Sequence, residues 1–260
     1  MRVIVCLIII LQVSFVEAQQ PATSKYTLKE ALDAAHRNNP AATSDSGRKN
    51  LGFDIKSAWY NWIYRILKHQ TLREYQIELN DLERIAMLRS NAGEDESYET
   101  LRLLGIYAEI QTSAATSLND ISICHNRIRQ LLFSVTGIVP ADSGLTLYEI
   151  DKGFAHDLPQ WVQNDTSAQF RYQLFIYSTT IENKELELDN LFIKLQYYNT
   201  YGLTRANHAI HFAKARFESE EIDYPVYIDQ LTDAYRLKLE YLELLNNYNQ
   251  SAIQLEYYAY

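Results

Sequence analysis

Apolar residues recur along most of the chain at alternating steps of three and four positions. That spacing places them on one face of an α-helix. Short breaks rich in Gly, Pro, Asn and acidic residues separate the periodic stretches, and such residues end helices. The pattern predicts helices over residues 28–38, 53–90, 97–135, 158–196, 197–217 and 224–258.

Local signals mark the ends of several of these elements. Thr27 precedes the first helix and Glu30 follows three residues later, which is the capping-box pattern. Pro40 ends this helix, and we expect residues 41–52, which contain two glycines, to form a loop. Residues 145–150 alternate in polarity, which predicts one short strand. The predicted fold is therefore all-α, with long antiparallel helical hairpins and one short strand.

The third and the last helical runs carry apolar stripes typical of a coiled-coil seam. The last helix carries two stripes, so we expect it to have neighbours on two sides, as in a wall of helices. The residues expected to be buried between helices are Leu101, Leu104, Ala108, Leu118, Leu231, Tyr235 and Leu242.

The pattern of the first half recurs in the second half. A shift of 127 residues places Glu94 on Glu221 and Leu104 on Leu231. Each half consists of a helix, a tight acidic turn and a long helix, with a break expected at Gly202 in the second. The expected units are a signal peptide (1–18), an N-terminal helix and loop (19–52), a first helical-hairpin repeat (53–140), a linker with the strand (141–157) and a second repeat (158–260).

The first eighteen residues are typical of an export signal. Arg2 gives a positive start, residues 3–16 are almost wholly apolar, and Ala18 places a small residue at the cleavage position. The apolar run is too short to span a bilayer comfortably. We therefore expect an exported protein whose one remaining cysteine, Cys124, is a small buried hydrophobe.

Composition and motifs argue against several classes of function. A formal net charge of −9 disfavours binding to nucleic acid, because phosphate contacts need a basic surface. No glycine-rich phosphate loop and no Gly-x-Ser-x-Gly elbow is present, so we expect neither catalysis nor a cofactor. His208 and His211 share a helix face, but a zinc site needs a third ligand, so no metal site is expected.

Carboxylates gather at the two main breaks between helices. The first group is Glu94, Asp95 and Glu96, and the second is Glu218, Glu220, Glu221 and Asp223. Two antiparallel hairpins of similar length place their turns at the same end. The groups are then either solvated turn residues or one negative surface that attracts cations or a basic partner.

Several segments resemble the TolC-like outer-membrane efflux factors. Residues 26–40 (YTLKEALDAAHRNNP) are similar to the opening of that family, and residues 89–97 (RSNAGEDES) to its first hairpin tip. Residues 220–228 (EEIDYPVYI) resemble the second tip. Residues 247–255 (NYNQSAIQL) are similar to the segment found in members that accompany heavy-metal pumps of the CusA/CzcA type.

The resemblance implies a homotrimer that acts as the channel component of a tripartite efflux system. Such a system exports heavy-metal ions or small toxic compounds with a periplasmic adaptor and an inner-membrane pump of the resistance-nodulation-division (RND) type. It implies a place in the outer membrane or periplasm, with no catalysis and no cofactor. It also implies that the adaptor meets the tips at Arg89, Gly93, Glu94, Ser97, Arg216, Glu221, Asp223 and Tyr224.

The sequence departs from the family where the strands of its barrel should lie. Residues 41–52 and 193–203 are each too few for two spanning strands of about 9–11 residues. We therefore expect the membrane β-barrel to be absent. This leaves an alternative open, in which the chain is a soluble periplasmic helical interaction protein derived from the family and has no channel activity.

Overall fold

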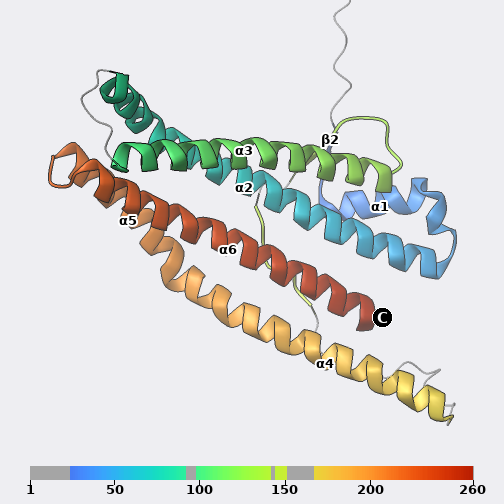
Figure 1. Cartoon of the computed structure of the whole chain (residues 1–260). Coiled ribbons are helices and arrows are strands. Elements are labelled where there is room, and N and C mark those ends of the chain that lie inside the picture. Colours follow the sequence, from blue (N-terminus) through green and yellow to red (C-terminus); the bar gives the residue numbers. More distant parts are fainter. Residues whose placement is uncertain (1–23, 92–97, 142–143, 151–166, 260) are drawn as a thin grey trace, which may run out of the picture.

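The computed structural model describes residues 24–91, 98–141, 144–150 and 167–259. Most of them lie in helices (Figure 1), namely α2 (Asp45–Asn91), α3 (Tyr98–Leu131), α4 (Ala168–Tyr197), α5 (Leu203–Glu218) and α6 (Tyr224–Ala259). At about 1.5 Å per residue, the 47 residues of α2 extend over roughly 70 Å. The predicted architecture of long antiparallel helical hairpins is confirmed.

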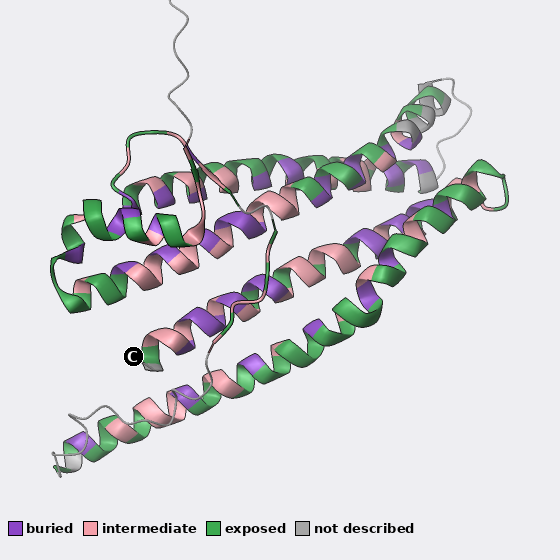
Figure 2. Ribbon diagram, turned by 180° about the vertical axis from the view of Figure 1, so that it is seen from behind, coloured by how far each residue is buried: buried purple, intermediate pink, exposed green. Residues whose placement is uncertain are grey.

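The helices lie side by side in the order α3, α2, α6 and then α4 with α5 (Figures 1 and 2). α2 and α3 form one antiparallel hairpin, α5 and α6 form the other, and α2 packs on α6 between them. The two middle helices bury residues on both flanks, as the two stripes of α6 predict. α3 forms one outer edge of this wall of helices, and α4 with α5 forms the other.

The ends of the helices repeat at the offset predicted from the sequence. α2 ends at Asn91 and α5 ends at Glu218, 127 residues later. The expected break at Gly202 is the π-helical turn η4 (Tyr198–Gly202), which joins α4 to α5. The second hairpin therefore has a jointed first helix where the first hairpin has the continuous α2.

A small cap closes the end of the wall that lies away from the hairpin turns. Strand β1 (Ser24–Tyr26) pairs in parallel with β2 (Ile138–Pro140), and α1 (Leu28–Asn38) packs on α2. The capping box of α1 is confirmed, because the Thr27 amide donates to Glu30 Oε2 at 2.8 Å and the Glu30 amide to Thr27 Oγ1 at 3.2 Å. The core of this cap includes Ala31, Ala35, Ile55, Trp59, Ile128 and Ile138.

The loop predicted over residues 41–52 is wrong. The chain forms the 3-10 turn η1 (Pro40–Thr43) and then enters α2 at Asp45, so Gly47 and Gly52 lie inside a helix. Ser44 starts α2, since its hydroxyl accepts a hydrogen bond from the Gly47 amide at 3.0 Å. Two glycines in this stretch indicated a loop, but the serine cap and the packing of the following residues outweigh their low helix propensity.

The strand predicted over residues 145–150 is also wrong. This segment runs extended across α2 and α6 without pairing to a strand among the described residues (Figure 2). The buried side chain of Asn249 takes the place of a partner strand. Its Oδ1 accepts from the Tyr148 amide at 2.8 Å, and its Nδ2 donates to the Thr146 carbonyl at 2.9 Å. The alternating pattern therefore reflects an extended segment that packs one of its sides against the helices.

The expected seam is half correct. Leu231 and Tyr235 are buried and Leu104 and Leu242 are half-buried, whereas Leu101, Ala108 and Leu118 are exposed. α3 carries two apolar stripes, and the one that packs on its neighbours is Leu103, Ala114, Ser117, Cys124, Ile128 and Leu131. The buried thiol of Cys124 fits the interpretation as a small hydrophobe, and burial raises its pKa.

Among the described residues, no helix combines the length and the hydropathy that crossing a bilayer requires.

Candidate partner-binding surfaces

The structure describes half of the residues predicted to meet an adaptor. Gly93, Glu94 and Ser97 lie outside the described residues, and of Arg89 only the backbone in the last turn of α2 is described. The other four, Arg216, Glu221, Asp223 and Tyr224, surround the turn between α5 and α6.

This turn closes with two hydrogen bonds that wrap the end of α5. The Glu221 amide donates to the Arg216 carbonyl at 2.8 Å and the Glu220 amide to the Phe217 carbonyl at 3.1 Å. The pair is the Schellman pattern, in which the first of the two donor residues along the chain is left-handed. Glu220 fills that position with a φ of 61°, where glycine is the usual residue.

Some charged residues of the turn form contacts within it, and others are exposed to solvent. Arg216 Nε lies 3.4 Å from Glu221 Oε2, an exposed ion pair across the turn. Asp223 caps the N-terminus of α6, because its Oδ1 accepts a hydrogen bond from the Val226 amide at 3.2 Å. Glu218 and Glu220 are exposed. One arginine thus faces four carboxylates, so the described turn keeps a negative charge.

The structure brings the start of α3 close to this turn. The hydroxyls of Tyr224 and Thr100 lie 3.3 Å apart. Behind them, the rings of Phe217 and Tyr227 stack with centroids 4.7 Å apart, and Leu103 packs into the same cluster. Burial, together with the nearby carboxylates of Glu78 and Glu218, raises the pKa of Tyr227 to about 12. Two hairpins are therefore held together near their ends.

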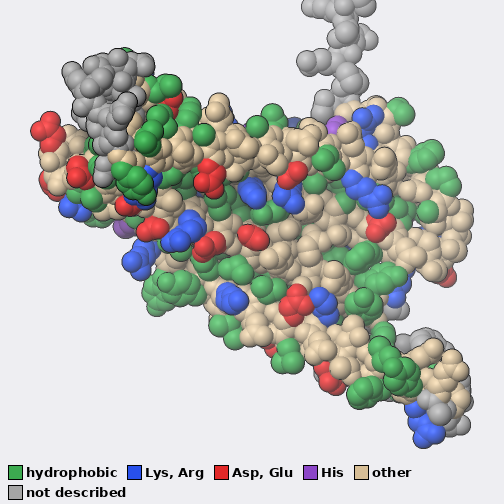
Figure 3. Space-filling view, in the orientation of Figure 1, with side chains coloured by type: hydrophobic (Ala, Val, Ile, Leu, Met, Phe, Trp, Pro, Cys, Tyr) green, Lys and Arg blue, Asp and Glu red, His purple; other side chains and the backbone are tan. Residues whose placement is uncertain are grey.

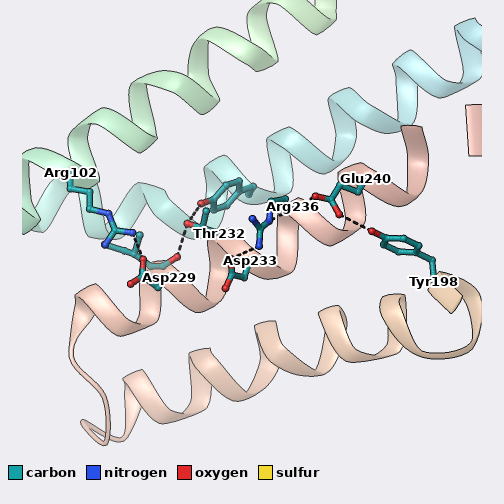
Figure 4. A network of polar contacts seen from close by, with 9 residues as sticks. Arg102, Tyr198, Asp229, Thr232, Asp233, Arg236 and Glu240 are labelled. Atoms are coloured by element: carbon teal, nitrogen blue, oxygen red, sulfur yellow. Dashed lines mark hydrogen bonds and ion pairs between the residues drawn. The ribbon is translucent and has the colours of Figure 1, made fainter. Parts of the chain in front are cut away.

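A row of polar residues on α6 continues away from the turn (Figure 4). Asp229 pairs with Arg102 of α3, and Glu240 accepts from the Tyr198 hydroxyl of η4 at 2.7 Å. Between them, the Thr232 hydroxyl lies 2.7 Å from that of Tyr75 on α2. Burial and the bond to Glu240 raise the pKa of Tyr198 to about 12. One helix thus makes polar contacts with three neighbours.

Sequence reasoning missed this polar row, although a signal was present. Asp229, Asp233, Arg236 and Glu240 follow steps of four, three and four residues, the same spacing as the apolar stripes. Arg236 also pairs with Asp233 at 2.9 Å, within one turn of the helix. A charged stripe at helical spacing predicts one polar face, but it does not identify the neighbours that the face meets.

A cavity of about 510 Å³ lies beside this row, between α3 and α6 and over α2. Its apolar part includes Leu72, Ile110 and Leu239. Charged side chains surround these, among them Lys68, Glu109, Asp120, Arg236, Glu240 and Glu243. The cavity therefore offers charges of both signs around an apolar floor.

Both outer edges of the wall expose large apolar side chains. On α3 these include Leu101, Leu118 and Ile123, which are 64%, 55% and 58% exposed. On the other edge they include Phe175, Leu186, Ile193, Tyr197, Tyr201 and Phe212 along α4, η4 and α5. Figure 3 shows hydrophobic side chains at several places along this edge. Exposed apolar surface of this extent is typical of a protein interface.

No group of three His, Cys, Asp or Glu side chains that could hold a metal ion is found in the described part of the chain. His208 and His211 lie exposed on α5.

Comparison with known proteins gives a likeness in fold. No protein-family model matches the sequence, and no curated protein matches it significantly. The structure is similar to CusC, which was solved in a study of folding and transmembrane channel formation, with a TM-score of 0.60 and 11% identity over 89% of this chain and 74% of that one. A membrane protein from Pseudomonas aeruginosa has a TM-score of 0.60 and 13% identity, over 88% of this chain and 72% of the other. The shared feature is the TolC-like arrangement of long helices.

Proposed function

We propose that the chain is a cell-envelope efflux component whose copies join edge to edge into a closed tunnel of helices. The observation that carries the proposal is a wall of helices with two different open edges, both lined by exposed apolar side chains. Two unlike surfaces join head to tail, and such contacts close into a ring when the rotation fits. The likeness in fold to CusC supports the same arrangement.

We propose further that the ring is a homotrimer in the outer membrane or periplasm. It exports heavy-metal ions or small toxic compounds together with a periplasmic adaptor and an RND-type inner-membrane pump. The turns of both hairpins form the docking end. Arg216, Glu221, Asp223 and Tyr224 contribute from the second hairpin, and Arg89, Gly93, Glu94 and Ser97 from the first. The negative charge of the described turn steers a basic adaptor surface, and salt weakens that attraction.

Oligomeric state tests the ring directly. Ile193→Glu on α4 and Leu118→Glu on α3 place a charge on opposite edges, at side chains that are 64% and 55% exposed. We expect each to convert the assembly to monomers with the helical content intact, as measured by light scattering and circular dichroism. Ile77→Glu is the matched control, because Ile77 is 65% exposed on α2, a middle helix, and should leave the assembly unchanged.

The opposite result is equally informative. A wild-type chain that stays monomeric at all concentrations, and that a high-salt wash releases from the outer-membrane fraction, would contradict the tunnel. It would favour a soluble periplasmic helical interaction protein instead.

Docking is tested by neutralising the turn without damaging it. Glu218→Gln and Glu221→Gln remove charge, and Asp223→Ser keeps a side-chain cap for α6. We expect the combined variant to bind the cognate adaptor more weakly at low salt, with the difference shrinking at moderate salt. Equal binding at both salt concentrations, with the fold intact, would show that this turn is not the docking surface.

A further inference from the structure

A second cavity, of about 310 Å³, lies at the end of the wall away from the hairpin turns. Its lining residues come from α1, α2 and α6. Figure 1 shows where these helices lie near the C-terminal end of the chain. Three of its residues, Arg48, Lys49 and Lys56, are cationic and come from the first turns of α2. The whole chain has a net charge of −9, so this concentration of positive charge goes against its overall balance.

The single carboxylate in the cavity is already neutralised. Lys56 Nζ lies 2.8 and 2.6 Å from the two carboxylate oxygens of Glu256, and the Tyr148 hydroxyl donates to the same group. Arg48 and Lys49 are left with a surplus of two positive charges. Neither forms an ion pair with any residue in the described part of the chain.

Both surplus cations are held in place while part of each stays available. Arg48 Nε donates to the Ala42 carbonyl at 2.9 Å, and the two Nη atoms make no hydrogen bond with the residues described. Lys49 Nζ lies 4.8 Å from the centroid of the Tyr257 ring. Partial desolvation lowers the pKa of Lys49. Both side chains are exposed and line the same open cavity, where they offer two donors of different shape.

A glycine and two aromatic rings line the cavity. A Cβ built on Gly52 would meet no atom within 4 Å, although Gly52 lies inside α2 where glycine is a poor helix former. Phe53 and Tyr257 pack at 4.8 Å between centroids, and the Tyr257 hydroxyl donates to Asn50 Oδ1 at 2.7 Å. The space beside Gly52 is therefore open, and two packed rings line it.

We propose that this cavity binds a phosphate monoester group between Arg48 and Lys49. The arginine fork can engage two phosphate oxygens, and the lysine adds a point charge, so together they match a dianion better than a single carboxylate. A phospholipid headgroup such as that of phosphatidic acid and a soluble phosphate ester share this chemistry. The inference does not depend on the proposed tunnel.

The test measures binding of two probes to the mature chain. Calorimetric titration with glycerol 3-phosphate reports a soluble ester. Co-sedimentation with phosphatidylcholine vesicles, with and without phosphatidic acid, reports the lipid. We expect binding of at least one probe. Binding to the acidic vesicles alone identifies the headgroup as the source, and binding to both probes identifies the phosphate group itself.

Matched variants locate the binding in this cavity. Gly52→Leu fills the space, and Gly105→Leu is its control, because a Cβ on Gly105 in α3 also meets nothing within 4 Å. We expect Gly52→Leu to weaken binding about tenfold or more while Gly105→Leu leaves it unchanged. Lys49→Gln should weaken it likewise, and Lys29→Gln on the exposed side of α1 should not. No binding of either probe to the wild type, or equal binding by Gly52→Leu, would overturn the proposal.

Discussion

Arg102 of α3 and Asp229 of α6 form an ion pair although they lie 127 residues apart in the sequence. That separation equals the offset between the two hairpins, so the pair joins equivalent positions of the two repeats across the wall. Both side chains are about half exposed, at 41% and 52%. An exposed pair of this kind contributes little to stability.

The strength of this pair can be measured by a double-mutant cycle of Arg102→Gln and Asp229→Asn. We expect a coupling energy of about 0.2–1 kcal/mol from urea denaturation, and a smaller one at high salt. A control cycle combines Arg102→Gln with Asp54→Asn. Asp54 lies near the start of α2, far from the hairpin turns, so the changes in unfolding free energy should be additive. Coupling that is absent, or that does not respond to salt, would contradict the pair.

A second prediction concerns the left-handed residue in the α5–α6 turn. Glu220 has a φ of 61°, which strains any residue with a Cβ. Glu220→Gly should therefore raise the free energy of unfolding by about 0.5–1 kcal/mol. Ser219→Gly is the control, because Ser219 has a φ of −87° and gains nothing from glycine. Equal effects of the two substitutions would show that the turn carries no such strain.

A third prediction concerns alkaline pH. Burial raises the pKa of Tyr227 from 10.0 to about 12, so the folded state keeps a proton that the unfolded state loses. The stability from Tyr227 is therefore complete below pH 10 and is lost as the pH rises through about 12. Burial raises the pKa of Tyr75 in the same direction.

Urea denaturation between pH 10 and about 12 measures this loss of stability. We expect the unfolding free energy of the wild type to fall steadily with pH, and Tyr227→Phe to fall less steeply. Tyr172→Phe is the control, because the Tyr172 ring is 65% exposed. A variant with the slope of the wild type would show that Tyr227 does not contribute to the alkaline loss of stability.

The parts of the fold that local signals determine were predictable from the sequence. The capping box at Thr27 and Glu30 fixes the start of α1, and the turn residues before Tyr224 fix the start of α6. These signals act within one helical turn, so no knowledge of distant neighbours is needed. The two hairpins and their common offset follow from where such signals fall.

The parts that distant residues determine were not predictable. Residues 145–150 alternate as a strand does, but Asn249, a hundred residues away, supplies their hydrogen bonds. The polar contacts of α6 also depend on residues that are distant in the sequence. The acidic residues of the turn were evident, whereas the pairing of Asp229 with Arg102 required α3 and α6 both to pack on α2. A stripe of charges predicts the polar face of one helix, but it does not predict which neighbouring helix that face contacts.

The last prediction separates the two apolar stripes of α3, which have the same period and differ only in what they meet. Leu103 is 1% exposed in the core shared by both hairpins, so Leu103→Ala should lower the unfolding free energy by about 2–5 kcal/mol. Leu101 is 64% exposed, so Leu101→Ala should change the unfolding of a dilute monomer by no more than about 0.5 kcal/mol. In the proposed ring, Leu101 lies on an edge, and its loss should weaken the association of copies in sedimentation measurements. Equal destabilisation by the two variants would mean that the Leu101 stripe is buried within one protomer, and the α3 edge would then not be open.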